Sequence, residues 1–156
     1  MLQKLDFKDI LVTKICHDLA PPLMAIDNGL EYMGEDNKDL QDKAIHLIKS
    51  NSKIAIERLK FFRYIYGMGG EQGGISIIEL RNMSLQFFQA LGNKYTLNWS
   101  LSSNEAQSIT HARGRLILSF LYAVSSLMVY GGEMELDLDS ERSFFRIRGI
   151  SPKDIG

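Results

Sequence analysis

A histidine beside a carboxylate, followed closely by two prolines, is the part of this sequence best suited to chemistry. The residues are His17, Asp18, Pro21 and Pro22. They lie within residues 11–33, where apolar side chains recur every three or four positions, the spacing of one buried helical stripe. At about 100° per residue, His17 projects away from that stripe and toward solvent. The imidazole is therefore accessible to a partner, unless Pro21 simply ends the helix and His17 is an incidental surface residue.

The two prolines fit poorly into an ordinary surface helix. Neither has an N–H group, so each leaves a carbonyl about one turn earlier without its helical partner, at a cost of roughly 3 kcal/mol or more. One of these carbonyls belongs to His17 itself, one turn before Pro21. We expect a kink here that loosens the backbone around the imidazole and lets the helix bend when a partner docks.

Five further residues share the outer face of this helix with His17, and we predict that they contact a docked partner. At about 100° per residue they project in nearly the same direction. They are Ile10, Thr13, Pro21, Met24 and Asn28. Apolar side chains such as Ile10 and Met24 would be unusual on a free surface, which favours a partner that covers them.

Two long helices position this face. The first is predicted over residues 6–33, where Asp6 can cap it, and the second over residues 39–66, after a turn in which Asp36 or Asn37 can be the N-cap. The second helix carries two apolar rows, more than one partner helix can cover. We expect a twofold dimer in which two hairpins form a four-helix bundle, although a second domain folded over the extra row is an alternative.

The rest of the chain is predicted to form an α+β domain. Residues 67–74 are rich in glycine, but they follow a predicted helix and lead into a predicted strand. A phosphate-binding loop has the reverse order, strand before and helix after, so we interpret residues 67–74 as a linker. Beyond them we predict strands over 75–78, 95–101, 133–139 and 143–148, helices over 80–91 and 113–130, and a polar loop over 102–110. The expected organisation is therefore a helical hairpin at 1–66, a linker at 67–74 and a small domain at 75–156.

Composition limits the possible partners. The net charge is −1, from 18 basic and 19 acidic residues that are interspersed, which predicts no affinity for nucleic acid or acidic membranes. No run of about 18 apolar residues and no signal-peptide pattern is present, so we expect a cytoplasmic protein. The single cysteine, Cys16, fits a reducing compartment and is expected to be a small buried side chain.

The other two histidines offer no comparable chemistry. His46 lies in the second helix without a following proline or acidic neighbour, and we expect an ordinary surface or interface residue. His111 is predicted in a loop before Arg113 and Arg115, with no cysteine or carboxylate cluster that would suggest a metal site.

The stretch around His17 resembles a known motif. Residues 17–26 read His-Asp-Leu-Ala-Pro-Pro-Leu-Met-Ala-Ile, similar to the H box of two-component histidine kinases, where an acidic residue, leucine and proline follow a phospho-acceptor histidine. With Cys16 before it and Asn28-Gly29-Leu30-Glu31 after it, the stretch most resembles the ChpT-type histidine phosphotransferases. That family combines a kinase-like dimerisation hairpin with a degenerate ATPase-like domain.

The resemblance extends along the chain through the order of its elements. Strand, helix, strand, helix, strand, strand is the order in the kinase ATP-binding domain, and residues 118–123 stand where kinases carry the N box. Ala123 occupies the place of the asparagine that holds Mg²⁺ against the nucleotide, and neither an Asp-x-Gly-x-Gly motif nor a second glycine-rich lid follows. The resemblance thus implies a degenerate ATPase-like α/β sandwich that does not bind ATP, because nothing would orient a γ-phosphate.

A chain of this kind has a phospho-acceptor but no source of phosphate of its own. The resemblance implies a histidine phosphotransferase of a bacterial multistep phosphorelay, not an ATP-dependent autokinase. His17 would take phosphate from the aspartate of one receiver domain, such as that of a hybrid histidine kinase, and pass it to another. Histidine suits this because it is partly neutral near pH 7 and leaves readily once phosphorylated. Asp18 would orient or assist the ring.

No cofactor of its own is expected, because the receiver domains would supply Mg²⁺. An alternative function remains: a non-catalytic, kinase-derived module that binds and inhibits a kinase or receiver, with His17 vestigial. The predicted exposure of His17 and its intact sequence context favour phosphotransfer, since an inhibitor has little need of the acceptor.

Overall fold

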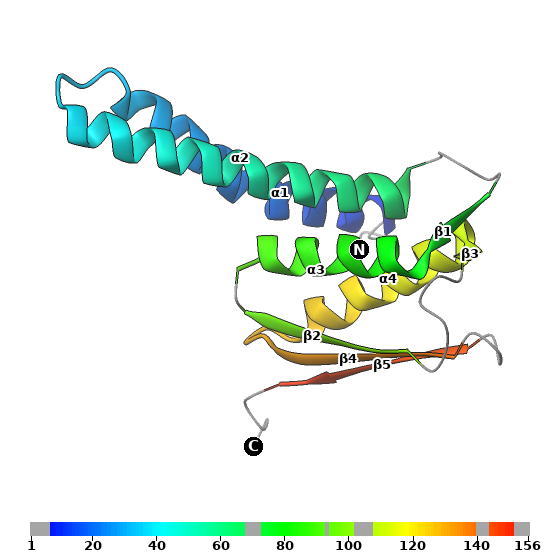
Figure 1. Ribbon diagram of the computed structural model, residues 1–156. Helices are drawn as coiled ribbons and strands as arrows, with labels where there is room; N and C mark the ends of the chain where they lie inside the picture. Colours follow the sequence, from blue (N-terminus) through cyan, green and yellow to red (C-terminus); the bar gives the residue numbers. More distant parts are fainter. Residues whose placement is uncertain (1–6, 68–72, 93, 102–107, 140–143, 152–156) are drawn as a thin grey trace, which may run out of the picture. The chain divides into compact units, whose positions relative to one another are not determined.

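The chain folds into four helices and five strands in the part that the computed structural model describes, residues 7–67, 73–92, 94–101, 108–139 and 144–151 (Figure 1). The predicted α+β class is confirmed. Contacts divide the chain into two compact units, Met1–Phe62 and Arg63–Gly156. The second helix continues a few residues past this division, to Tyr66.

The first unit is an antiparallel pair of long helices, α1 (Phe7–Tyr32) and α2 (Lys38–Tyr66) (Figure 1). Both lie close to their predicted bounds, while Asp6, the predicted cap of α1, lies outside the described residues. Asn37 is the N-cap of α2, because its side-chain oxygen accepts hydrogen bonds from the backbone N–H groups of Asp39 and Leu40, at 3.1 and 3.3 Å. Pro21 and Pro22 both lie within α1, so Pro21 does not end the helix.

The face of α1 that meets α2 differs from the apolar stripe expected from the sequence. Pro22 and Gly29 are buried on it, and a Cβ atom at Gly29 would lie only 2.7 Å from Cγ1 of Ile48 in α2. Glycine therefore allows the two helices to approach closely. Leu30 and Met33, which the spacing of three and four places in the buried stripe, are exposed instead. Leu30 projects to one side of this contact, and Met33 lies in the turn beyond the end of α1.

The second unit contains two sheets and two helices. Its elements are β1 (Gly74–Ser76), α3 (Ile77–Ala90), β2 (Tyr95–Leu101), β3 (Ser108–Thr110), α4 (His111–Leu127), β4 (Gly132–Asp139) and β5 (Phe144–Ile150). In the larger sheet, of order β2-β4-β5, β2 runs parallel to β4 and β5 runs antiparallel to it. In the smaller sheet, β1 pairs antiparallel with β3.

Two predictions for this unit need correction. The strand predicted over residues 75–78 ends at Ser76, because Ser76 and Glu79 form a capping box that begins α3 at Ile77. The loop predicted over residues 102–110 contains β3, which was missed because only Ile109 of its three residues is apolar; Ile109 pairs with Ile75. Residues 102–107 and 140–143 lie outside the described part.

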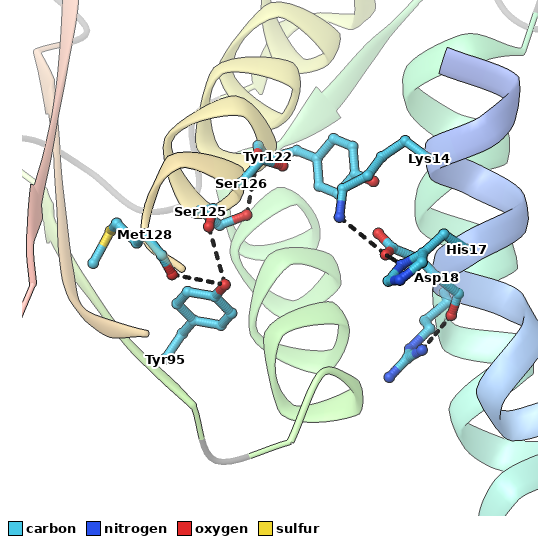
Figure 2. A network of polar contacts seen from close by, with 9 residues as sticks. Lys14, His17, Asp18, Tyr95, Tyr122, Ser125, Ser126 and Met128 are labelled. Carbon is cyan, nitrogen blue, oxygen red and sulfur yellow. Dashed lines mark hydrogen bonds and ion pairs between the residues drawn. The ribbon is translucent and has the colours of Figure 1, made fainter. Parts of the chain in front are cut away.

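Helices α3 and α4 cover one face of the larger sheet, and the apolar core of this unit lies between the two layers (Figure 1). The buried side chains include Leu80, Phe87, Phe88, Ile117, Leu118, Leu121, Met134, Leu136 and Leu138. The hydroxyl of Tyr95 lies 3.0 Å from the carbonyl of Ser125 and 3.3 Å from that of Met128, at the end of α4 (Figure 2). These carbonyls also accept hydrogen bonds from the backbone N–H groups of Met128 and Gly131, so a side chain of β2 adds a second donor at the end of the helix.

Among the helices that the structure describes, none has the length and apolar character needed to cross a membrane.

Candidate functional site

The candidate site is centred on His17, near the middle of α1. Its side chain is 78% exposed, as the helical periodicity predicted, while the side chain of Asp18 is only 8% exposed. Nδ1 of His17 lies 3.3 Å from Oδ1 of Asp18 (Figure 2). The ring is thus anchored on one side by a nearly buried carboxylate and accessible on the other.

Lys14 completes this cluster from the preceding turn of α1. Its Nζ lies 3.0 Å from the same Asp18 oxygen that faces the imidazole (Figure 2). The spacing of four residues places both side chains on one side of the helix. A charge partner of this kind offsets part of the cost of removing the carboxylate from water.

The hydrogen bond between His17 and Asp18 determines which ring nitrogen can react. An ionised carboxylate only accepts hydrogen bonds, so Nδ1 of the imidazole must carry the proton when this bond forms. In the neutral ring, Nε2 then holds the free electron pair. The geometry therefore favours Nε2 as the nucleophilic atom.

The predicted docking residues lie mostly on the surface around His17. Thr13, Pro21 and Asn28 are exposed, and Met24 is 66% exposed. The side chain of Ile10 lies outside the described part of the structure. The exposed residues therefore form a mixed polar and apolar surface on α1 beside the imidazole. That a partner docks on this surface stays a prediction.

Two residues near Asp18 were not among the predicted site residues. Lys14 could have been found from its spacing of four residues from Asp18. Arg58 of α2, whose Nη1 donates a hydrogen bond to the backbone carbonyl of Asp18, gives no such signal, because the contact depends on how α1 and α2 align.

The remaining cysteine and histidines lie away from this cluster. Cys16 is exposed, so the prediction of a buried side chain is wrong. It directly precedes His17 and projects to the side of α1 that α2 does not cover. His46 is exposed, as expected. His111 is the first residue of α4, not a loop residue, and its Nδ1 lies 3.5 Å from Oη of Tyr64. Burial raises the pKa of Tyr64, so this hydroxyl stays protonated at neutral pH.

Ala123, which the resemblance predicts to stand in place of a kinase asparagine, is exposed on α4. Its methyl group cannot ligate a metal ion. Within the described residues, no three histidine, cysteine, aspartate or glutamate side chains gather closely enough to hold one.

Comparison with known proteins places the chain beside bacterial phosphotransferases. A solved structure of a bacterial phosphotransferase superposes with a TM-score of 0.69 and 28% identity, over 94% of this chain and 67% of that one. The chain is also 30% identical, over 139 residues, to the protein phosphotransferase ChpT of Brucella abortus (strain 2308). The resemblance to ChpT-type phosphotransferases that was predicted from residues 16–31 is thereby confirmed.

The match to the Brucella protein covers 88% of this chain but only 63% of that relative's length. A search of protein-family models finds none that matches this chain.

Proposed function

We propose that this protein is a histidine phosphotransferase of a bacterial multistep phosphorelay. In this proposal His17 accepts a phosphoryl group from the aspartyl phosphate of one receiver domain and passes it to the aspartate of another. The observation that carries the proposal is the exposed imidazole of His17, whose Nδ1 faces the nearly buried carboxylate of Asp18. Similarity to a sequence relative and to a solved structure that are both named phosphotransferase supports it.

The geometry suits a transfer in which no proton needs to leave the ring. Nε2 attacks phosphorus, the P–N bond forms, and the P–O bond to the receiver carboxylate breaks with its electron pair returning to that carboxylate. The ring becomes a cation that keeps its proton on Nδ1, and the negative charge of Asp18 stabilises this cation. In the second step another receiver carboxylate attacks phosphorus, and the electron pair of the P–N bond returns to Nε2.

We also propose that the hairpin dimerises into a four-helix bundle. Exposed side chains follow α1 at heptad positions: Val12, Cys16, Leu23 and Leu30. Leu19 and Ile26 are half-buried and complete the alternating spacing of three and four that is typical of helix–helix seams. This row is centred about 140° away from His17, so a second copy could cover it without covering the imidazole.

The second unit is, in this proposal, a degenerate ATPase-like domain that does not bind ATP. Ala123 supports this, because it offers no ligand for Mg²⁺ where kinases have asparagine. The protein then needs no cofactor of its own, and the receiver domains supply the Mg²⁺ that the transfer requires.

The test is transfer of label to this protein from receiver domains that have been charged by their kinase with radiolabelled ATP. We expect acid-labile label on the wild type and on a His46→Ala control, which removes another exposed histidine, and none on His17→Ala. ATP alone should label none of the three. Binding to receivers without any label would instead favour a docking inhibitor in which His17 is vestigial.

A further inference from the structure

Pro22 leaves a gap in the backbone hydrogen bonds of α1, directly beside the candidate acceptor. It has no N–H, so it cannot donate to the carbonyl of Asp18 one turn earlier. Both residues are buried, with Asp18 only 7% exposed. A buried carbonyl without a donor costs about 1–3 kcal/mol, so this gap needs a partner from elsewhere.

Arg58 of α2 supplies that partner. Nη1 of its guanidinium donates a hydrogen bond to the Asp18 carbonyl across the hairpin. The donor is charged, and hydrogen bonds of this kind are stronger than those between neutral groups. In an intact helix, the backbone N–H of residue 22 would donate to the Asp18 carbonyl. Here a side chain of the neighbouring helix donates to it instead.

We propose that Arg58 is a positioning residue for His17, an inference that rests on the proposed phosphotransfer. Asp18 and Pro22 project roughly 100° and 140° away from His17, so the guanidinium lies on the α2 side of α1 and not beside the reacting phosphoryl group. Its effect passes through the backbone: it fixes the peptide that joins Asp18 to Leu19, directly after the residue whose carboxylate faces the His17 ring. In-line transfer between two proteins depends on such placement, because an error of about 1 Å can cost about a hundredfold in rate.

The Pro22 gap makes this proposal testable by a double-mutant cycle. Arg58→Met keeps the length of the side chain but removes the donor, and we expect it to slow single-turnover transfer roughly tenfold. Its affinity for the receiver should change little, because Arg58 is not on the face around His17. Pro22→Ala restores the N–H donor to Asp18, so Arg58→Met should have less than about a twofold effect in that background.

Two further variants separate this role from a general effect of charge or folding. Lys60→Met removes a positive charge from the same helix, where Lys60 pairs with Glu57 at 2.9 Å, and it should leave transfer unchanged. Arg58→Lys retains a donor and should recover part of the lost rate. If Arg58→Met slows transfer equally with and without Pro22, or does not slow it at all, the proposal is wrong.

Hydrogen exchange distinguishes failure of this proposal from failure of the proposed function. Peptides that cover residues 15–23 should exchange faster in Arg58→Met than in wild type, and this difference should vanish in the Pro22→Ala background. If that coupling appears but the wild type accepts no phosphate, the phosphotransfer is wrong and the backbone contact stands. If transfer depends on His17 but the coupling is absent, Arg58 has no positioning role.

Discussion

At the residue scale, the contact between His17 and Asp18 controls which nitrogen of the imidazole is reactive. Asp18 is nearly buried and its Oδ1 lies 3.0 Å from Nζ of Lys14, so its carboxylate is held in place without a partner. In the proposed phosphotransfer, the His17 ring is thereby oriented before a receiver arrives, which removes part of the ordering cost from the encounter.

We expect Asp18→Ala to release the ring and to change its tautomer. Nitrogen chemical shifts of the neutral imidazole should place the proton on Nδ1 in the wild type and shift it toward Nε2 in the variant. Transfer should slow by roughly tenfold or more, because the ring loses the hydrogen bond that orients it and selects its tautomer. Asp27→Ala removes an exposed carboxylate from the same helix and should change neither quantity. Equal tautomer populations in wild type and Asp18→Ala would contradict the role given to Asp18.

At the element scale, the capping box at the start of α3 makes the stability of the second unit depend on pH. The hydroxyl and backbone N–H of Ser76 both bond to the Glu79 carboxylate, and these hydrogen bonds, the side-chain one foremost, lower the pKa of Glu79 from its ordinary value of 4.5. A lowered folded-state pKa stabilises the fold above the unfolded-state value. That contribution disappears as the pH falls through the folded-state pKa.

Ser76→Ala should therefore destabilise the protein by about 1 kcal/mol at neutral pH, the usual cost of losing a serine N-cap. The difference from wild type should shrink as the pH falls through the lowered pKa of Glu79, because the protonated carboxyl group no longer accepts both bonds. Urea unfolding from pH 7 to pH 3 measures this difference, and Ser76→Thr, which keeps a hydroxyl, is the control. A stability gap that is independent of pH would show that Glu79 contributes nothing to the cap.

The sequence predicted elements well where a periodic pattern and a turn agreed. The bounds of α1, α2 and β2 follow from such patterns, as does the exposure of His17. Strand β3 was missed because three residues with one apolar member carry no alternation to recognise. The contact between Arg58 and the Asp18 carbonyl was out of reach for a different reason: it depends on the alignment of two helices, which no local spacing encodes.

At the scale of the whole molecule, the two faces of α1 predict separate effects on assembly and on transfer. Leu30 is 57% exposed and lies in the heptad row proposed as the dimer seam, whereas Met24 lies on the face of His17. Leu30→Glu should produce monomers, because a charge would be buried in the bundle at a cost of several kcal/mol. Met24→Glu should leave the dimer intact and weaken receiver binding.

Sedimentation equilibrium and receiver titration measure these two effects independently. If Leu30→Glu remains dimeric, the seam lies elsewhere on the hairpin. If Met24→Glu binds receivers as well as wild type, the face around His17 is not where they dock.

The parallel pairing of β2 with β4 has a consequence for how this chain acquires its structure. Tyr95 pairs with Gly132, and the whole of β3 and α4 lies between the two strands in the sequence, whereas α1 and α2 are joined by a short turn. Loop closure makes distant pairings slow and local ones fast, so we expect the hairpin helices to form first and the sheet to close last. Trp99, the single tryptophan of the chain, lies on β2 opposite Leu136. Its fluorescence therefore reports the late step of folding, while helical circular dichroism reports the early one.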